Sequence, residues 1–117
     1  SLKIKPVEKI KLSQLSFNLD GLIPTIVQEK TSNEILMLAY SNKQSLELSM
    51  KSQKAHFWSR SRKKIWFKGE TSGNTLKLFD IYTDCDTDTL IFEVELEGSG
   101  ACHTGSKSCF FKKIENE

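Results

Sequence analysis

The sequence predicts a mostly β (α+β) fold: a partly closed, barrel-like mixed sheet with one short helix, in a single domain over residues 1–117. Three observations predict it. Polarity alternates with period two over several short segments, as in strands that bury one face. One segment alone has the apolar spacing of a helix. About seven strands in so short a chain must protect their edges, which favours a sheet that curls toward closure.

The expected strands are segments of β-forming residues that lie between turn residues. In order they are residues 23–29, 35–40, 55–59, 65–68, 76–82, 89–97 and 110–114. The first two are joined by the turn cluster 30–33 and form a hairpin. In the fifth, the alternation slips between Leu78 and Phe79, which indicates a bulge. The sixth has the clearest alternation and predicts one buried face and one wet face.

The expected helix follows the second strand. Ser41 and Gln44 have the spacing of a capping box, which predicts the helix start. Leu46 and Met50 lie four residues apart and predict its buried side, and we expect the helix to end near Lys51.

Composition argues against several classes of function. Lys and Arg total 17 against 15 Asp and Glu, so the net charge of +2 does not indicate nucleic-acid binding. No apolar run approaches the roughly 20 residues of a membrane-spanning helix, and no signal peptide is visible. We therefore expect a cytoplasmic protein. The three cysteines are an odd number, which favours free thiols or metal ligation over disulfides.

The cysteines are the first candidate metal ligands. Cys102 and Cys109 lie on a loop that contains Gly105, whereas Cys85 is remote in sequence. Thiolates favour Zn²⁺, and three protein ligands leave the fourth tetrahedral position open for water, as in catalytic sites. The alternative is that all three are small buried apolar residues.

Three aspartates surround the first cysteine. In an extended backbone, Asp84, Asp86 and Asp88 point to one side and Cys85 to the other. Three neighbouring carboxylates repel one another unless a cation neutralises them, and oxygen ligands suit Mg²⁺. A solvated acidic turn is the alternative. A calcium-binding EF-hand is excluded, because Thr89 stands where that loop needs glycine.

The direction of Cys85 leads to a hypothesis about assembly. Because its thiol faces away from the acid cluster, Cys85 could join a cysteine pair of another subunit. The zinc site would then lie between two chains.

A basic turn predicts an anion site. Arg60 and Arg62 alternate with Ser59 and Ser61, which in an extended segment places both guanidinium groups on one face. Arginine binds phosphate through paired N–H groups, and serine adds neutral donors. The alternative is a solvated hairpin tip. A further alternative, single-stranded nucleic-acid binding, would use three aromatic residues as stacking platforms: Phe57, Trp58 and Trp66.

The following loop and one histidine complete the candidates. Residues 68–74 combine Lys68 and Glu70 with hydroxyls and two glycines, which permit close approach to a ligand. His103 directly follows Cys102 and could accept or donate a proton near neutral pH. His56 lies in an expected strand that is rich in aromatic residues, so we expect it to have a structural role.

Several motifs occur here in one order. They are Leu36-Met37-Leu38-Ala39-Tyr40, Ser59-Arg60-Ser61-Arg62, Trp66 with Lys68-Gly69-Glu70-Thr71-Ser72-Gly73, Asp84-Cys85-Asp86-Thr87-Asp88, Cys102-His103-Thr104-Gly105 and Cys109-Phe110. Together they resemble the phosphoribosyl-AMP cyclohydrolases of histidine biosynthesis, over about residues 21–110. Each motif alone is unspecific, but all of them in register are hard to obtain by chance.

The resemblance implies an activity, two metals and an assembly. Such enzymes open the adenine ring of N1-(5-phosphoribosyl)-AMP between N1 and C6 and give the formimino-imidazolecarboxamide ribotide intermediate. They act as homodimers, bind zinc through cysteines of both subunits, and require magnesium. On this pattern the zinc ligands are Cys85, Cys102 and Cys109, with Cys85 shared across subunits. The magnesium ligands are Asp84, Asp86 and Asp88.

The resemblance also suggests a mechanism. Zinc would lower the pKa of its bound water, and the resulting hydroxide would attack C6. His103 is the first candidate for the general acid/base and Glu70 the second. The phosphates and ring of this small-molecule substrate would contact eight residues: Ser59, Arg60, Ser61, Arg62, Trp66, Lys68, Ser72 and Asn74. Asn74 stands where relatives often have His, so the resemblance does not decide whether the Asn74 side chain contacts the substrate.

Two rival functions remain at this point. In a non-catalytic zinc module, His103 would close the site as a fourth ligand and the ion would join the dimer. A single-stranded nucleic-acid binder would show strongly salt-dependent binding. Some relatives continue into a phosphoribosyl-ATP pyrophosphohydrolase domain; since this chain ends at Glu117, we expect that activity to be absent from it.

Overall fold

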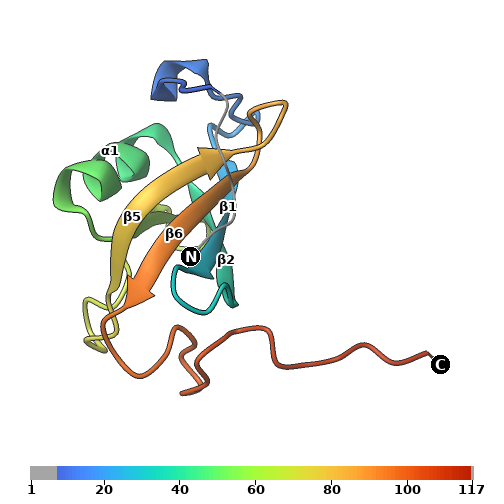
Figure 1. Cartoon of the computed structure of the whole chain (residues 1–117). Helices are drawn as coiled ribbons and strands as arrows, with labels where there is room; N and C mark the ends of the chain where they lie inside the picture. The colour runs from blue at the N-terminus through green and yellow to red at the C-terminus, as the bar shows by residue number, and fades with distance from the viewer. Residues whose placement is uncertain (1–7, 117) are drawn as a thin grey trace.

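The computed structural model describes residues 8–116, which fold around one six-stranded sheet (Figure 1). The strands are β1 (Ile23–Glu29), β2 (Ile35–Ser41), β3 (His56–Ser59), β4 (Lys64–Phe67), β5 (Leu76–Thr83) and β6 (Leu90–Leu96). Helix α1 (Lys43–Ser52) lies between β2 and β3, and a short 3-10 helix (Leu12–Gln14) precedes β1. The prediction of a mostly β fold with one short helix is confirmed. The 3-10 helix was not predicted.

The sheet is mixed and curls toward closure. Its strand order is β4-β3-β2-β1-β6-β5, with β1 and β6 parallel and the other pairs antiparallel. Just before β3, Lys54 forms a bridge to Lys77 on β5, and the Ala55 N–H donates to the Leu76 carbonyl at 3.0 Å. The segment before β3 thereby meets β5, at the far end of the strand order, which confirms the predicted partly closed sheet.

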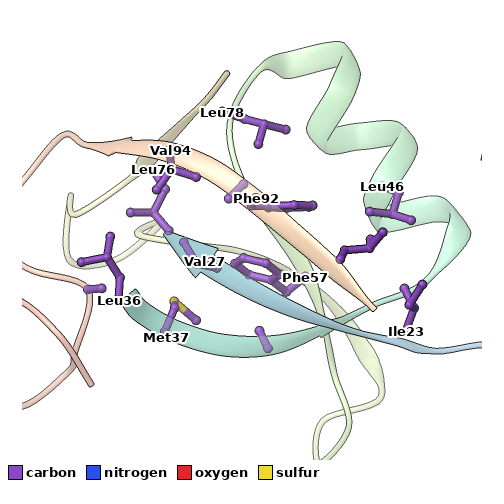
Figure 2. Close-up of a cluster of buried hydrophobic side chains, with 14 residues drawn as sticks. Ile23, Val27, Leu36, Met37, Leu46, Phe57, Leu76, Leu78, Phe92 and Val94 are labelled. Carbon is purple, nitrogen blue, oxygen red and sulfur yellow. The ribbon is translucent and has the colours of Figure 1, made fainter. Parts of the chain in front are cut away.

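One face of the sheet packs against α1 and forms the core. Ile23, Val27, Phe57 and Phe92 are fully buried, and Leu46 of α1 packs among them (Figure 2). The Phe57 and Phe92 rings stack with centroids 5.6 Å apart. The predicted bulge in β5 is present between Leu78 and Asp80, and it returns Ile81 to the core face opposite Phe92.

The predicted start of α1 was wrong, whereas its end near Lys51 is confirmed, and of its predicted buried residues Leu46 is buried and Met50 is not. The N-cap is Asn42, whose side-chain oxygen accepts from the Ser45 N–H at 2.8 Å. Ser41 does not cap, because its hydroxyl is buried in β2 and hydrogen-bonded to Thr25 at 2.7 Å. Met50 is exposed, and the buried side of the helix is formed by small serines and one leucine: Ser45, Leu46 and Ser49.

The predicted last strand, 110–114, does not form. After Cys109 the chain runs away from the sheet as an exposed segment without strand pairing (Figure 1). Its last bond to the sheet is the Cys109 N–H donating to the Leu36 carbonyl at 2.7 Å. β3 pairs with β2 only at Tyr40, so the β2 edge near Leu36 accepts this one bond, and the chain beyond it does not continue along the edge. Among the described residues, no helix is long and apolar enough to cross a membrane.

Candidate active site

Two cysteines meet in a loop that follows β6. Backbone hydrogen bonds fold this loop: Ala101 N–H donates to Lys107 at 2.9 Å and Cys102 N–H to Ser106 at 3.2 Å. The Ser108 hydroxyl fixes it to the start of β2 by donating to the Ile35 carbonyl at 2.7 Å. Cys102 and Cys109 are thereby brought within hydrogen-bonding reach of each other. The predicted cysteine pair is present at one end of the sheet.

The two thiols differ in their tendency to ionise. The Thr104 hydroxyl lies 3.0 Å from the Cys102 Sγ, and this contact, with the Thr104 N–H, lowers the pKa of that thiol. Burial of its sulfur, followed by the effect of Cys102, raises the pKa of Cys109. Cys102 is therefore the thiol that ionises first, and such a thiolate is the form that binds metals.

A buried lysine faces this pair. Lys68 directly follows β4, and 7% of it is exposed. Burial lowers the pKa of its ammonium group, while the nearby Cys109 and Cys102 act in the opposite direction. A positive charge beside two thiols favours their ionised forms. Lys68 therefore belongs to the cysteine end of the molecule.

The loop after Lys68 is held by its neighbours. Gly69 has a φ of +88°, and a Cβ placed there would come within 2.5 Å of the Asn74 backbone. The Asn74 side-chain oxygen accepts from the Ser99 N–H at 3.1 Å, which ties this loop to the turn after β6. Asn74 thus has a structural contact. Glu70 and Ser72 are exposed on the same loop.

An ion-pair network anchors the cysteine loop to the β1–β2 hairpin. The Lys107 ammonium lies 2.7 Å from Glu29 Oε1 and 3.2 Å from Glu34 Oε1. Ser32 also donates to Glu29, at 2.6 Å. Lys107 and then Ser32 lower the pKa of the Glu29 carboxyl. Sequence reasoning missed this network, since nothing in the spacing of Glu29 and Lys107 indicates contact.

The three aspartates lie in the turn between β5 and β6. The predicted extended backbone was wrong: the Thr87 N–H donates to the Asp84 carbonyl at 3.2 Å, and Thr87 has a φ of +60°. The carboxylates converge nevertheless. Ligand atoms of Asp84, Asp86 and Asp88 lie within 4.8 Å of one another, the one such cluster of three acids, cysteines or histidines in residues 8–116.

Crowding of these carboxylates shifts their ionisation. The side chains of Asp88 and Asp84 raise the pKa of Asp86 to about 6. Desolvation raises the pKa of Asp84, but hydrogen bonds with the side chains of Asp86 and Asp88 and from the N–H groups of Asp88 and Thr89 outweigh it, so the pKa is lowered. The turn therefore presents concentrated negative charge, which a divalent cation would neutralise.

Cys85 lies with these aspartates and far from the cysteine pair. Its turn is at the start of β6, and Cys102 follows the end of β6, so the strand separates them (Figure 1). At about 3.3 Å per residue, Leu90–Leu96 spans about 20 Å. Within the described part of one chain, the three predicted zinc ligands do not come together.

The basic turn also differs from prediction. Residues 60–63 form a compact turn, with the Lys63 N–H donating to the Ser59 carbonyl at 2.8 Å, instead of an extended segment. The Arg60 guanidinium stacks on the Tyr40 ring, 3.9 Å from its centroid. Arg62 is exposed, and Ser59 and Ser61 lie 3.5 Å apart through their hydroxyls. These groups remain accessible to an anion.

The other predicted residues fall near these two ends. His103 is exposed in the loop beside Cys102. Trp66, on β4, is partly exposed, and the Lys68 ammonium lies 5.8 Å from its ring centroid. A hollow of about 450 Å³ lies beside the aspartate turn, lined in part by Pro24, Asp88 and Thr89. One chain therefore carries two partial sites at opposite ends of the sheet.

Comparison with known proteins gives one consistent result. Residues 37–111, more than half of the chain, match the family model of phosphoribosyl-AMP cyclohydrolase. A phosphoribosyl-AMP cyclohydrolase of Desulfotalea psychrophila is 52% identical over 83% of this chain and 76% of its own length. One of Archaeoglobus fulgidus is 50% identical over 89% of this chain and 95% of its own. A histidine biosynthesis bifunctional protein of Prochlorococcus marinus is 49% identical, and the match spans 49% of its length.

Proposed function

The chain belongs to the phosphoribosyl-AMP cyclohydrolase family of histidine biosynthesis, and from this premise we propose the metals and residues that carry its reaction. The substrate is N1-(5-phosphoribosyl)-AMP. Water adds to C6 of the adenine ring, the C6–N1 bond breaks, and N1 takes a proton. The observation that carries the assignment is the identity of about half of all aligned residues with cyclohydrolases matched over most of their length.

We propose that zinc is held by Cys102 and Cys109 of one chain and Cys85 of a second. The donor set fits: two thiols lie together, and Thr104 and Lys68 favour their ionised forms. The third thiol is about a strand length away in the same chain, so a homodimer is needed to complete the ligand set. Zinc, when bound, would supply Lewis-acid activation of the attacking water.

Magnesium fits the aspartate turn. Three carboxylates within 4.8 Å offer the oxygen ligands that this ion prefers, and their mutual repulsion is relieved by a cation. In a dimer that shares Cys85, this turn lies beside the partner's cysteine loop, because Cys85 is part of it. Both sets of candidate ligands would then border one substrate site.

The chain's own residues bind the substrate and move its protons. Arg60 and Arg62 are accessible to bind phosphate through their N–H groups. The Arg60 guanidinium is already oriented by stacking on the Tyr40 ring. Lys68 offsets the negative charge that three thiolates bring to the site. His103, exposed beside Cys102, is the group that protonates N1, with Glu70 as the second candidate.

The test follows the ultraviolet absorbance of phosphoribosyl-AMP with purified protein, before and after treatment with a chelator. We expect turnover that the chelator abolishes and that zinc together with magnesium restores. Cys109→Ser should lose both zinc and activity. Turnover that survives complete removal of zinc would contradict the metal assignment, and salt-dependent oligonucleotide binding without hydrolysis would contradict the enzyme assignment.

A further inference from the structure

We propose that Ser16, in the segment before β1, is a positioning residue for the aspartate turn, residues 84–88. Its hydrogen bonds hold the turn in the conformation in which three carboxylates converge, and they thereby raise the affinity of the turn for a divalent cation. The proposal deepens the proposed function and rests on it, since it takes this turn as the magnesium site. Ser16 lies outside residues 37–111, which match the family model, so that match assigns it no role.

Two hydrogen bonds join Ser16 to the turn. The Ser16 N–H donates to the Thr87 carbonyl at 2.8 Å, and the two side-chain hydroxyls lie 2.9 Å apart. The two residues are 71 positions apart in sequence, and the fold brings the segment before β1 beside the turn between β5 and β6 (Figure 1). Because one bond engages the backbone of Thr87 and the other its side chain, together they fix the orientation of this residue as well as its position.

Thr87 is the residue of the turn that most needs support. Its φ is +60°, a left-handed conformation that a β-branched residue seldom adopts. Repulsion between the carboxylates on either side of it, those of Asp86 and Asp88, also opposes the closed turn when no cation is bound. Strained backbone persists where its surroundings hold it. The two bonds from Ser16 are contacts of this kind, and they come from outside the turn.

The conformation of Thr87 decides where the carboxylates lie. With the chain reversed at this residue, the N–H groups of Asp88 and Thr89 both donate to Asp84 Oδ1, at 3.1 and 3.2 Å. Ligand atoms of all three aspartates then lie within 4.8 Å of one another. In an extended backbone, residues 84 and 88 would be about 13 Å apart, at about 3.3 Å per residue. A contact that holds Thr87 therefore holds the ligand set together.

Ser16 is itself held in place from both sides. Its neighbours Leu15 and Phe17 are partly buried and pack against the core. The Asn18 side-chain oxygen accepts from the Leu22 N–H at 2.9 Å, which fixes the chain just before β1. Ser16 thus approaches the turn from an anchored segment, so its bonds can resist the opening of the turn.

The experiment measures metal affinity directly. Ser16→Ala removes the hydroxyl bond at an exposed side chain and leaves the core untouched. Mn²⁺, which binds oxygen ligands as Mg²⁺ does, is titrated into zinc-loaded protein, and the electron paramagnetic resonance signal of free Mn²⁺ gives the dissociation constant. We expect Ser16→Ala to raise this constant by about 3- to 5-fold, within the range that the loss of one hydrogen bond allows. Ser16→Thr retains a hydroxyl and should bind Mn²⁺ nearly as the wild type does.

The matched control is Ser52→Ala. Ser52 is also exposed, and its hydroxyl donates to the Leu48 carbonyl at 2.8 Å, but it lies on α1. Its substitution should leave the dissociation constant for Mn²⁺ unchanged. Ser16→Ala should keep its zinc and should reach the wild-type rate at saturating Mg²⁺, because the substitution changes the affinity for the metal and not the chemistry. Unchanged Mn²⁺ affinity with a lower zinc content or a lower saturated rate would show a merely structural role and overturn the proposal.

The partner residue supplies a second test. Thr87→Ala should also weaken Mn²⁺ binding, and Ser16→Ala should add nothing in that background, because the bonded hydroxyl is gone. Additive effects of the two substitutions would overturn the proposal. Equal Mn²⁺ affinities of Ser16→Ala and the wild type would overturn the positioning role and leave the magnesium assignment standing. Mn²⁺ binding that survives Asp86→Asn undiminished would overturn the magnesium assignment, and this proposal with it.

Discussion

The role of His103 can be separated experimentally from that of the proposed metal ligand beside it, Cys102. His103 is exposed next to Cys102, yet its ring is not required to hold the loop, whose hydrogen bonds come from the backbone and Thr104. Replacing it by alanine should remove proton transfer and lower kcat by about 100-fold or more, with zinc content unchanged. Metal analysis and steady-state rates on the same sample test this. Wild-type turnover in His103→Ala would transfer the role to Glu70.

Glu29 should stabilise the protein through its charge. Its folded pKa is lowered below the ordinary value of 4.5 by Lys107 and Ser32, so its contribution is present above that value and is lost as the pH falls below it. Glu29→Gln should therefore lower the free energy of unfolding by about 1 kcal/mol at pH 7. Urea denaturation should show this difference shrinking below about pH 4.5.

A matched control for this prediction is the second acid on Lys107. Glu34 lies farther from the ammonium, at 3.2 Å, and its side chain is more exposed. Glu34→Gln should therefore have the smaller effect. If Glu29→Gln lowers the free energy of unfolding by the same amount at every pH, then packing, and not charge, holds the cysteine loop.

At the scale of single elements, the loop after β4 depends on close backbone contact. Gly69 and Gly73 both have positive φ, at +88° and +79°, but only at Gly69 would a Cβ meet neighbouring backbone. Alanine at either position should lower the free energy of unfolding by about 1 kcal/mol, because residues other than glycine are strained at positive φ. Gly69→Ala should cost more and should raise the KM for phosphoribosyl-AMP, because Lys68 and Glu70 would shift. Equal effects of the two variants on stability and KM would contradict this account.

The cap at the start of α1 gives a prediction about stability that does not involve the candidate site. Asn42 accepts the Ser45 N–H, and Ser45 in return accepts the Asn42 N–H at 2.9 Å. Asn42→Ala should lower the free energy of unfolding by about 1 kcal/mol, whereas Asn42→Asp should not. Chemical denaturation measures both. Zinc content should be normal in each variant, since the helix lies away from both partial sites.

The positions of the strands could be predicted from the sequence, but the contacts between segments remote in sequence could not. Period-two patterning located six strands, and the slip at Leu78 located the bulge. The capping prediction failed at Ser41, because a buried bond to Thr25 on another strand engaged its hydroxyl. The predicted strand at 110–114 failed because a pattern does not specify an available neighbour. Parallel pairing of β1 and β6 involves segments remote in sequence, which periodicity does not report.

At the scale of the whole molecule, residue types predicted which side chains gather better than they predicted the local backbone geometry. The aspartates converge as predicted, but through a turn and not an extended strand. Cys102 and Cys109 meet, because the loop between them returns on itself. The charge of Lys68 near this pair, and the ion pair of Glu29 with Lys107 that anchors the cysteine loop, depend on side chains that the fold brings together. Spacing along the chain holds no information about them.

The most direct test of the central claim, a zinc site completed by two chains, uses two inactive variants together. Cys85→Ser and Cys109→Ser are co-expressed with different tags, and the mixed dimer is isolated by both tags. One of its sites then has all three thiols and the other has one. We predict about one zinc per mixed dimer and about half of the wild-type activity, although each parent dimer is inactive. A mixed dimer as inactive and zinc-free as its parents would contradict the account.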